Sequence, residues 1–160
     1  MFKFFARFAS SQPPDPCERA LRALKRGELE SAEAQFTALL TEGVPALQRA
    51  FLLNKRGAAR ARLGNRDMAR ADFEAALEVV PNYAPSLVNV GNLALEDGLT
   101  GEAVKRYESA IVADARYAAA YFNLSVAYKR QERFGEAVSA LRTAQKLEAR
   151  IRLGKNGRRC

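Results

Sequence analysis

The sequence lacks histidine and tryptophan and contains only two cysteines in 160 residues. Without histidine it has neither a His-based catalytic triad nor a His zinc site, and two cysteines are too few for a multi-cysteine zinc site or a disulfide framework. The usual proton shuttle near neutral pH is missing as well. No apolar run approaches the roughly 18 residues that a membrane-spanning helix needs. These absences argue against the common hydrolytic, metal-binding and bilayer-spanning classes.

Motifs for catalysis are also missing. The sequence contains no GxxxxGK[ST] motif, no Gly-rich phosphate loop and no pattern that pairs a nucleophile with a base. Asp67, Asp72, Glu74 and Glu78 fall at the helical spacing that solvated faces use. We therefore expect no enzymatic activity, no cofactor and no metal site.

The charge is unevenly distributed. Apolar residues at 48% and charged residues at 28% indicate a globular chain, and its length suits one domain or one short repeat array. The net charge is +8, but residues 1–11 carry +2 and residues 150–160 carry +5. The body between these ends is therefore nearly neutral, so the charge excess says little about what the body binds.

The body repeats with a period of 34 residues. Units 50–83, 84–117 and 118–151 align without a gap, and a weaker copy at 13–49 precedes them at an offset of 37. The extra three residues fall around 41–45. Small residues, which allow close helix approach, and large residues, which fill the next layer, recur in register: Gly57, Gly91 and Ser125; Ala69, Ala103 and Ala137; Leu53, Leu87 and Tyr121; Phe73, Tyr107 and Leu141.

The periodicity predicts four helix pairs, at 16–26 and 29–42, 47–63 and 66–80, 84–97 and 100–113, and 118–131 and 134–152. Gly27, Gly64 and Gly98 are expected to end first helices with a positive φ. Gln145 replaces the apolar residue of the earlier units, as suits a surface that water reaches. Beyond Ile151 the chain is too short and glycine-broken for a closing helix. We therefore expect partial exposure of Val138, Leu141 and Leu147.

We call positions that are related by the repeat period a column. The residues in these columns resemble the tetratricopeptide repeat, whose unit runs large-x2-Leu-Gly-x2-Tyr, then Ala-x3-Phe, Ala and Pro. The third unit follows this pattern best, through Tyr121, Leu124, Tyr128, Phe134 and Ala137. The resemblance implies an all-α, helix–turn–helix repeat solenoid of about three clear units plus one degenerate N-terminal unit, wound into a right-handed superhelix. Neighbouring pairs stabilise one another by stacking.

The first registered unit departs from the family pattern at Arg56 and Arg60, where an aliphatic and an aromatic residue are usual. The family often admits an arginine beside Gly57, with its stem on apolar surface and its head in water. We expect the same of Arg56.

The resemblance also implies a function: a non-enzymatic protein–protein interaction adaptor or scaffold that holds a peptide or helix of a partner in its concave groove. Some members of the family bind the terminal carboxylate of a peptide with residues of their first helices. This chain has the matching residue only at Asn89, which disfavours that mode of binding. Members with an asparagine ladder match at Asn89 and Asn123, one period apart. Projecting the groove onto this chain predicts these partner-binding residues: Asn54, Arg62, Val88, Asn89, Asn92, Phe122, Asn123, Lys129 and Arg130.

We expect three segments: a Phe-rich segment at 1–12, the repeat array at 13–153 and a basic tail at 154–160. On a helical wheel, Lys3 and Arg7 lie opposite four phenylalanines, namely Phe2, Phe4, Phe5 and Phe8. This amphipathic segment either packs on the first helices or docks on a membrane or partner surface. Since the two basic residues interrupt a secretory signal core, we expect a cytoplasmic protein, in contact with a membrane only peripherally if at all.

Other functions stay open at this point. The basic termini suit an anionic surface, either acidic lipid or, less favoured, nucleic acid. A secretion-type chaperone is a third alternative, on size and repeat number alone. Self-association through the uncapped C-terminal end is a further expectation.

Overall fold

The computed structural model describes residues 15–41 and 43–156 of the chain. The phenylalanines of the N-terminal segment and the last four residues lie outside this part. The described residues form eight helices and no strand: α1 (Pro16–Arg26), α2 (Leu29–Leu39), α3 (Ala46–Arg62), α4 (Arg66–Val79), α5 (Ala84–Glu96), α6 (Thr100–Ala113), α7 (Ala118–Arg130) and α8 (Phe134–Asn156).

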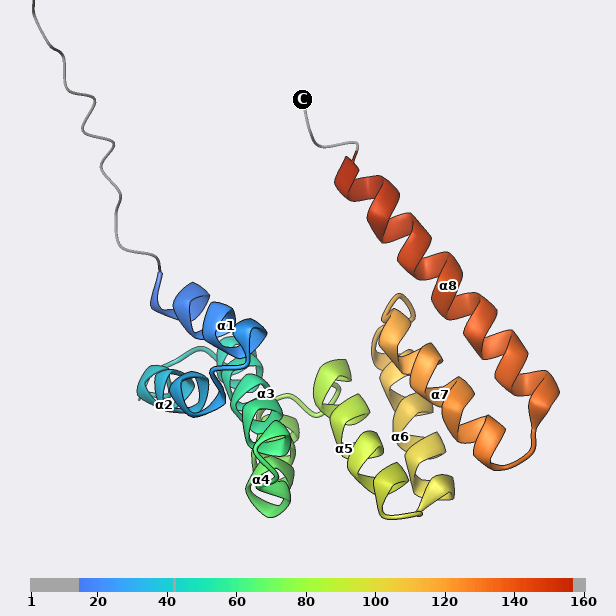
Figure 1. The fold of residues 1–160 in the computed structure, drawn as a ribbon, viewed down its shortest axis with the longest axis horizontal. Helices are drawn as coiled ribbons and strands as arrows, with labels where there is room; N and C mark the ends of the chain where they lie inside the picture. Colours follow the sequence, from blue (N-terminus) through green and yellow to red (C-terminus); the bar gives the residue numbers. More distant parts are fainter. Residues whose placement is uncertain (1–14, 42, 157–160) are drawn as a thin grey trace, which may run out of the picture.

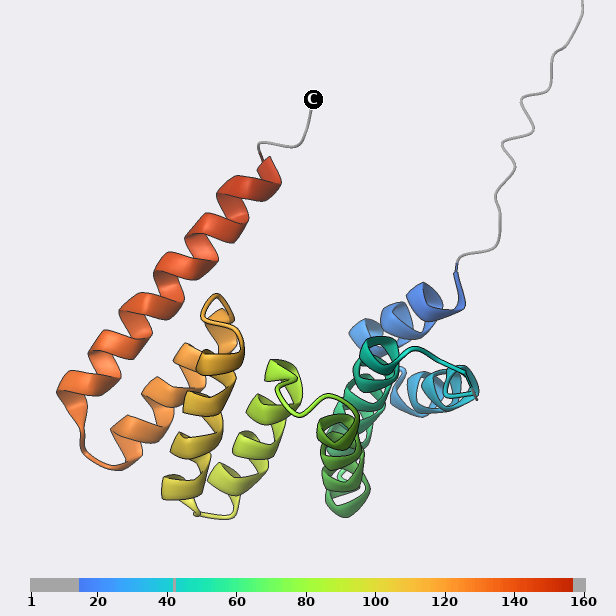
Figure 2. The same ribbon diagram turned by 180° about the vertical axis from the view of Figure 1, so that it is seen from behind.

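The helices stack in sequence order from α1 at one end to α8 at the other (Figures 1 and 2). Each helix packs against the next, and α3 contacts α5 as α5 contacts α7. The first helices of successive pairs therefore line one face of the array together. The predicted all-α repeat solenoid of four helix pairs is confirmed.

The connection between the first and second pairs is longer than the later ones. Because α2 ends at Leu39, three residues before the predicted end, and α3 begins at Ala46, residues 40–45 form this link. The links at 80–83 and 114–117 are shorter. The predicted insertion around 41–45 lies in this longer connection.

Glycine in the first helix of a pair allows an aromatic ring of the second helix to lie directly against the backbone. A Cβ on Gly57 would lie 2.6 Å from Cε1 of Phe73, and a Cβ on Gly91 would lie 2.6 Å from Cε1 of Tyr107. Both rings are buried, with 2% and 0% exposure. The third unit has Ser125 in the glycine column and the smaller Leu141 in the ring column, so the size of one residue compensates for the other.

A buried ion network, and not solvated side chains, occupies the arginine positions of the second pair. The guanidinium of Arg56 donates to both carboxylate oxygens of Asp72, at 2.6 and 2.9 Å. Arg60 donates to Asp72 at 3.0 Å and to Glu33 of α2 at 2.8 Å. The expectation that the head of Arg56 lies in water is wrong, and so is the interpretation of Asp72 as a solvated acid, because the Asp72 side chain is only 4% exposed.

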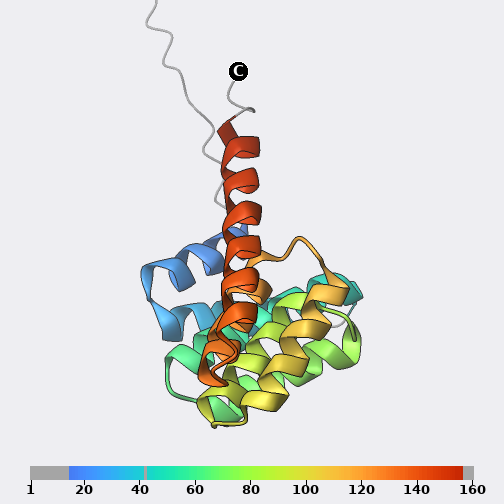
Figure 3. The same cartoon turned by 90° about the vertical axis from the view of Figure 1, so that its right-hand side faces the viewer.

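The last helix continues further than predicted. α8 passes through Gly154 to Asn156, and its C-terminal end projects beyond the body (Figure 3). In the second unit, Asp114 ends α6 by accepting the backbone N–H of Arg116 at Oδ1, at 2.8 Å. The third unit has Glu148 in that column, and Ala149 replaces Pro81 of the first unit. Without a stop signal the helix continues.

The end of the stack is exposed as predicted. Val138 is 47% exposed, Leu141 and Leu147 are half-buried, and Gln145 faces solvent. No pair follows to cover this surface within the described residues.

Glu132 adopts the left-handed conformation that glycine adopts in the other units. Gly27, Gly64 and Gly98 end their helices with positive φ, as predicted, and Glu132 does so at φ 59°. Its N–H and that of Arg133 close the turn onto carbonyls of α7 at 3.1 and 3.0 Å. A side chain strains this conformation, and a carboxylate at a helix C-terminus opposes the dipole.

We therefore expect Glu132→Gly to raise the free energy of unfolding by about 0.5–1 kcal/mol, because relief of strain exceeds the added entropy of the unfolded chain. Urea denaturation measures the difference. The control is Gln131→Gly at the preceding position, where φ is −90° and glycine offers no relief, so this variant should be destabilised. Loss of stability in Glu132→Gly would contradict the expectation.

Candidate functional site

A cavity of about 240 Å³ opens on the face formed by the first helices, between α3 and α5. Its apolar lining comes from Ala58, Ala61 and Leu93, with the ring of Phe73 below. Its polar lining comes from Arg62, Arg66, Asn89, Asn92 and Glu96. Three of the predicted partner-binding residues therefore come together here: Arg62, Asn89 and Asn92.

Asparagines join successive first helices by side-chain hydrogen bonds. Asn89 Nδ2 donates to Asn54 Oδ1 at 2.8 Å, and Asn123 Nδ2 donates to Asn92 Oδ1 at 3.0 Å. Each of these bonds uses one of the two N–H groups of Asn89 or Asn123. Within the described part of the chain, the Oδ1 atoms of Asn89 and Asn123 accept no hydrogen bond. Both side chains thus keep one donor and one acceptor for another molecule.

Asn92 is held in place from beneath. The hydroxyl of Tyr107 donates to Asn92 Oδ1 at 2.9 Å. Burial raises the pKa of Tyr107 to about 12, so the hydroxyl keeps its proton at any physiological pH. Asn92 Oδ1 therefore accepts from Tyr107 and Asn123 together, which orients the amide for its contacts in the cavity.

Two predicted site residues lie too deep to contact a partner. Asn54 and Val88 are each 3% exposed. Asn54 Oδ1 also accepts from Ser86 Oγ at 3.1 Å, and Val88 belongs to the core shared by α5, α6 and α7. Both support the groove from below, which corrects the prediction that they line it.

Two predicted arginines join neighbouring repeats. Arg62 donates through Nη1 to the carbonyl of Leu24 at 2.7 Å, and Arg130 donates through Nη1 to the carbonyl of Leu95 at 2.6 Å. Each guanidinium thus binds a C-terminal carbonyl of the first helix in the preceding pair, where a cation is stabilising. Arg62 and Arg130 stand two periods apart in the sequence, so the same contact recurs in the same column.

The rim of the cavity is a charge network that the sequence did not predict. Arg66 binds Glu96, and it also binds Asp97 at 2.6 Å. Arg70 binds the same Asp97 at 2.8 Å. The hydrogen bond that the Arg66 guanidinium donates to Glu96 is the main cause that raises the pKa of Arg66. The sequence indicates this network only by its charges. The basic residues Arg66 and Arg70 lie near the start of α4, the second helix of its pair, and the acidic residues Glu96 and Asp97 lie at the end of α5, the first helix of the next pair.

Phe122 and Lys129 lie at a different place from Asn89 and Asn92. They border a second cavity, of about 350 Å³, between α7 and α8 at the C-terminal end of the stack. Phe122 is 49% exposed there. The structure therefore divides the predicted site into an asparagine-lined pocket between repeats and an apolar groove at the end.

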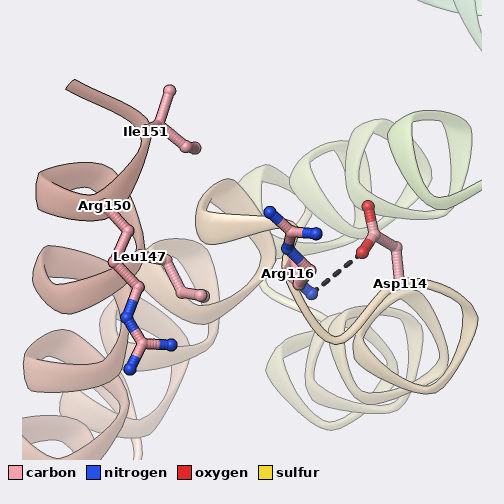
Figure 4. Close-up of a pocket in the computed structure, with 5 residues that line it drawn as sticks. All are labelled: Asp114, Arg116, Leu147, Arg150 and Ile151. Atoms are coloured by element: carbon pink, nitrogen blue, oxygen red, sulfur yellow. Dashed lines mark hydrogen bonds between the residues drawn. The ribbon is translucent and has the colours of Figure 1, made fainter. Parts of the chain in front are cut away.

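A third cavity, of about 440 Å³, is lined by none of the predicted site residues. It lies between the α6–α7 link and the projecting end of α8, where Leu147, Arg150 and Ile151 lie across from Arg116 and Asp114 (Figure 4). The carboxylate of Asp114 is engaged by the backbone of Arg116. This cavity follows from the length of α8.

Neither a metal-type cluster nor a membrane-spanning helix is found in the described residues. No group of three or more Cys, Asp and Glu side chains there could hold a metal ion. No helix there is both long enough and apolar enough to cross a membrane.

Residues 118–150 match the family model of the tetratricopeptide repeat. The chain carries a tetratricopeptide repeat and has the fold of that family. No curated protein matches its sequence significantly. Solved tetratricopeptide repeat structures do match its fold. MamA 41-end from Desulfovibrio magneticus RS-1 is 24% identical with a TM-score of 0.63, and the match covers 84% of this chain and 77% of that one.

Two other similar structures concern peptide binding in their own proteins. The second tetratricopeptide repeat domain of Spaghetti (RPAP3), bound to the HSP90 peptide SRMEEVD, is 22% identical with a TM-score of 0.58, covering 62% of this chain and 93% of that one. YrrB, described as having an unusual peptide-binding site, is 18% identical with a TM-score of 0.61, covering 88% and 71%. At these identities the likeness establishes the fold alone.

Proposed function

We propose that this tetratricopeptide repeat protein is a non-enzymatic adaptor that binds an extended segment of a partner protein along the face of its first helices. The observation that carries this proposal is the pair of amides of Asn89 and Asn123. They stand one period apart, and each keeps one donor and one acceptor after its contact with the neighbouring repeat.

An extended peptide offers the matching groups. Its backbone presents one N–H donor and one C=O acceptor per residue, and a side-chain amide pairs with both. The cavity beside Asn89 has an apolar lining from Ala58, Ala61 and Leu93, which suits a small or medium apolar side chain of the same peptide. A protein of similar fold, the second tetratricopeptide repeat domain of Spaghetti (RPAP3), is bound to a peptide in its own structure, which supports the proposal.

The test is affinity for a peptide selected from a random display library against the whole chain. We expect Asn89→Ala/Asn123→Ala to weaken binding by about tenfold, because each lost amide removes a hydrogen bond worth about 0.5–1.5 kcal/mol. Fluorescence anisotropy with the labelled peptide measures the change, and circular dichroism verifies that the variant is folded.

The matched control is Asn82→Ala, which removes an exposed amide in the turn between α4 and α5. It should leave the affinity unchanged. Equal losses in the control and the double variant, or no loss in either, would place the peptide elsewhere on the molecule.

A further inference from the structure

The apolar groove at the C-terminal end has the same lining columns as the buried junctions inside the array. This end groove is formed by Phe122, Ser125, Val126 and Lys129 of α7 with Phe134, Ala137, Val138 and Leu141 of α8. One period earlier, Val88, Val104 and Tyr107 stand in the columns of Phe122, Val138 and Leu141, and they are 3%, 7% and 0% exposed. In the end groove Phe122, Phe134 and Val138 are 49%, 60% and 47% exposed.

The array itself shows what covers such a surface. At the preceding junction, α7 covers α5 and α6 with Ala120, Leu124 and Ala127, all buried in one core. α5 presents Ser86, Val90 and Leu93 at the same spacing to the pair before it. The end groove is therefore shaped for one further helix with small or apolar residues at i, i+4 and i+7.

The charges beside the groove indicate the sign of the charge that such a helix would carry on its flanks. Lys129 lines the groove, and Arg142 follows Val138 by one turn, about 40° away on the wheel of α8. Arg152 lies on the same side of α8 but further along the helix, beyond the groove. Glu148 is the nearest carboxylate on that helix, about 80° from Val138. No ion pair within residues 15–41 and 43–156 involves Lys129, Arg142 or Arg152. A covering helix with acidic residues on its flanks would pair with these cations.

Charge also argues against the chain's own segments as the occupant. The free end of the array presents Arg19 and Arg22 of α1, both exposed, in the columns where α7 has Leu124 and Ala127. A second copy stacking head to tail would bury these arginines on apolar surface, which is costly. The projecting end of α8 is basic too, and the Phe-rich N-terminal segment carries Lys3 and Arg7.

We propose that the end groove is a docking site for an amphipathic helix of a partner protein, apolar at i, i+4 and i+7 and acidic on its flanks, in the place that a ninth helix of the array would take. This second surface goes beyond the extended-peptide site. It depends on the proposed function only in that both make the chain a protein-binding module.

The probe is a labelled helical peptide with the Ala, Leu and Ala spacing of α7 on one face and glutamates on its flanks. A peptide of the same composition in shuffled order is the reference. Anisotropy with the full chain should show a preference of at least about tenfold for the ordered peptide. No preference over the shuffled peptide would overturn the proposal.

Two variants locate the binding. Val138→Glu should weaken binding by at least about tenfold, because it places a charge in the groove and repels the acidic probe. Val112→Glu, at a residue of α6 that is 88% exposed, is the matched control and should change little. Lys129→Glu should weaken the binding of the acidic peptide and strengthen the binding of a version with lysines in place of glutamates. Equal losses in the Val112 and Val138 variants would overturn the assignment.

Further outcomes separate the alternatives. If the chain is a dimer that Val138→Glu dissociates, or if deleting residues 1–12 raises the affinity for the probe, the groove belongs to a second copy or to the N-terminal segment, and the proposal fails. Asn89→Ala/Asn123→Ala should keep its affinity for the helical peptide while its affinity for the extended peptide falls. Failure of the proposal at one site is therefore distinguishable from failure at the other.

Discussion

Replacing Asp72 with alanine should lower the free energy of unfolding by about 3–5 kcal/mol. The carboxylate of Asp72 is 4% exposed and accepts from Arg56 at 2.6 and 2.9 Å and from Arg60 at 3.0 Å. Its removal leaves two guanidiniums that are 17% and 13% exposed, and only Arg60 retains a carboxylate, that of Glu33. The cost arises from these uncompensated charges and not from lost packing alone.

Urea denaturation followed by circular dichroism measures this effect. The matched control is Asp67→Ala, at an exposed residue in the first turn of the same helix. Apart from the loss of the favourable interaction of Asp67 with the helix dipole, this change should lower the free energy of unfolding by well under 1 kcal/mol. Replacing Arg56, Arg60 and Asp72 together by leucine should restore much of the stability, because no charge then remains unpaired except at Glu33. A loss below about 1 kcal/mol in Asp72→Ala would show that the network is solvated.

Gly91→Ala should cost about 2–3 kcal/mol, as expected for overpacking against a rigid ring. The new Cβ would lie 2.6 Å from Cε1 and 3.0 Å from Cδ1 of Tyr107, and 3.2 Å from Cβ of Arg106. Tyr107 is fully buried and its hydroxyl is bonded to Asn92, so the ring cannot move away without losing that contact. The clash outweighs the gain in helix propensity that alanine normally gives over glycine.

A double-mutant cycle tests this cause. Tyr107→Leu reproduces the leucine of the third unit, where the small column holds Ser125. In that background Gly91→Ala should cost at least about 1 kcal/mol less than in the natural chain, because the ring is gone. Ser125→Ala is the control, since a Cβ is already present there. Additive effects of the two changes would mean that Gly91 matters for a reason other than its distance from Tyr107.

The repeat pattern predicted most of the fold because the same steric demand recurs at each junction. Small residues at 57, 91 and 125 and large ones at 73, 107 and 141 identify which faces meet, and positive-φ glycines mark where first helices end. The glycine-containing end of the sequence predicts that the last helix stops at residue 152, but α8 continues through Gly154 to Asn156. One glycine costs a helix only about 1 kcal/mol, and the stop signals of the earlier units are absent.

The candidate site was only partly predictable. Asn54 and Val88 lie in or beside columns that face the groove. Because successive side chains point about 100° apart around a helix, two adjacent columns can differ in whether the next helix pair covers them. Periodicity alone does not say which of the two is covered. The partners of Arg56 and Arg62 come from other helices, 16 and 38 residues away. Such pairings depend on how the helices cross, which a single sequence does not specify.

Site-specific cross-linking tests most directly whether a partner segment lies on the face of the first helices. A photo-reactive amino acid is placed at Ala58, which lines the cavity between α3 and α5, and in a second protein at Val112, which is exposed on α6. The peptide selected against the whole chain should cross-link efficiently from position 58 and not from position 112. Cross-linking from position 112 but not from position 58, with both proteins folded, would contradict the account.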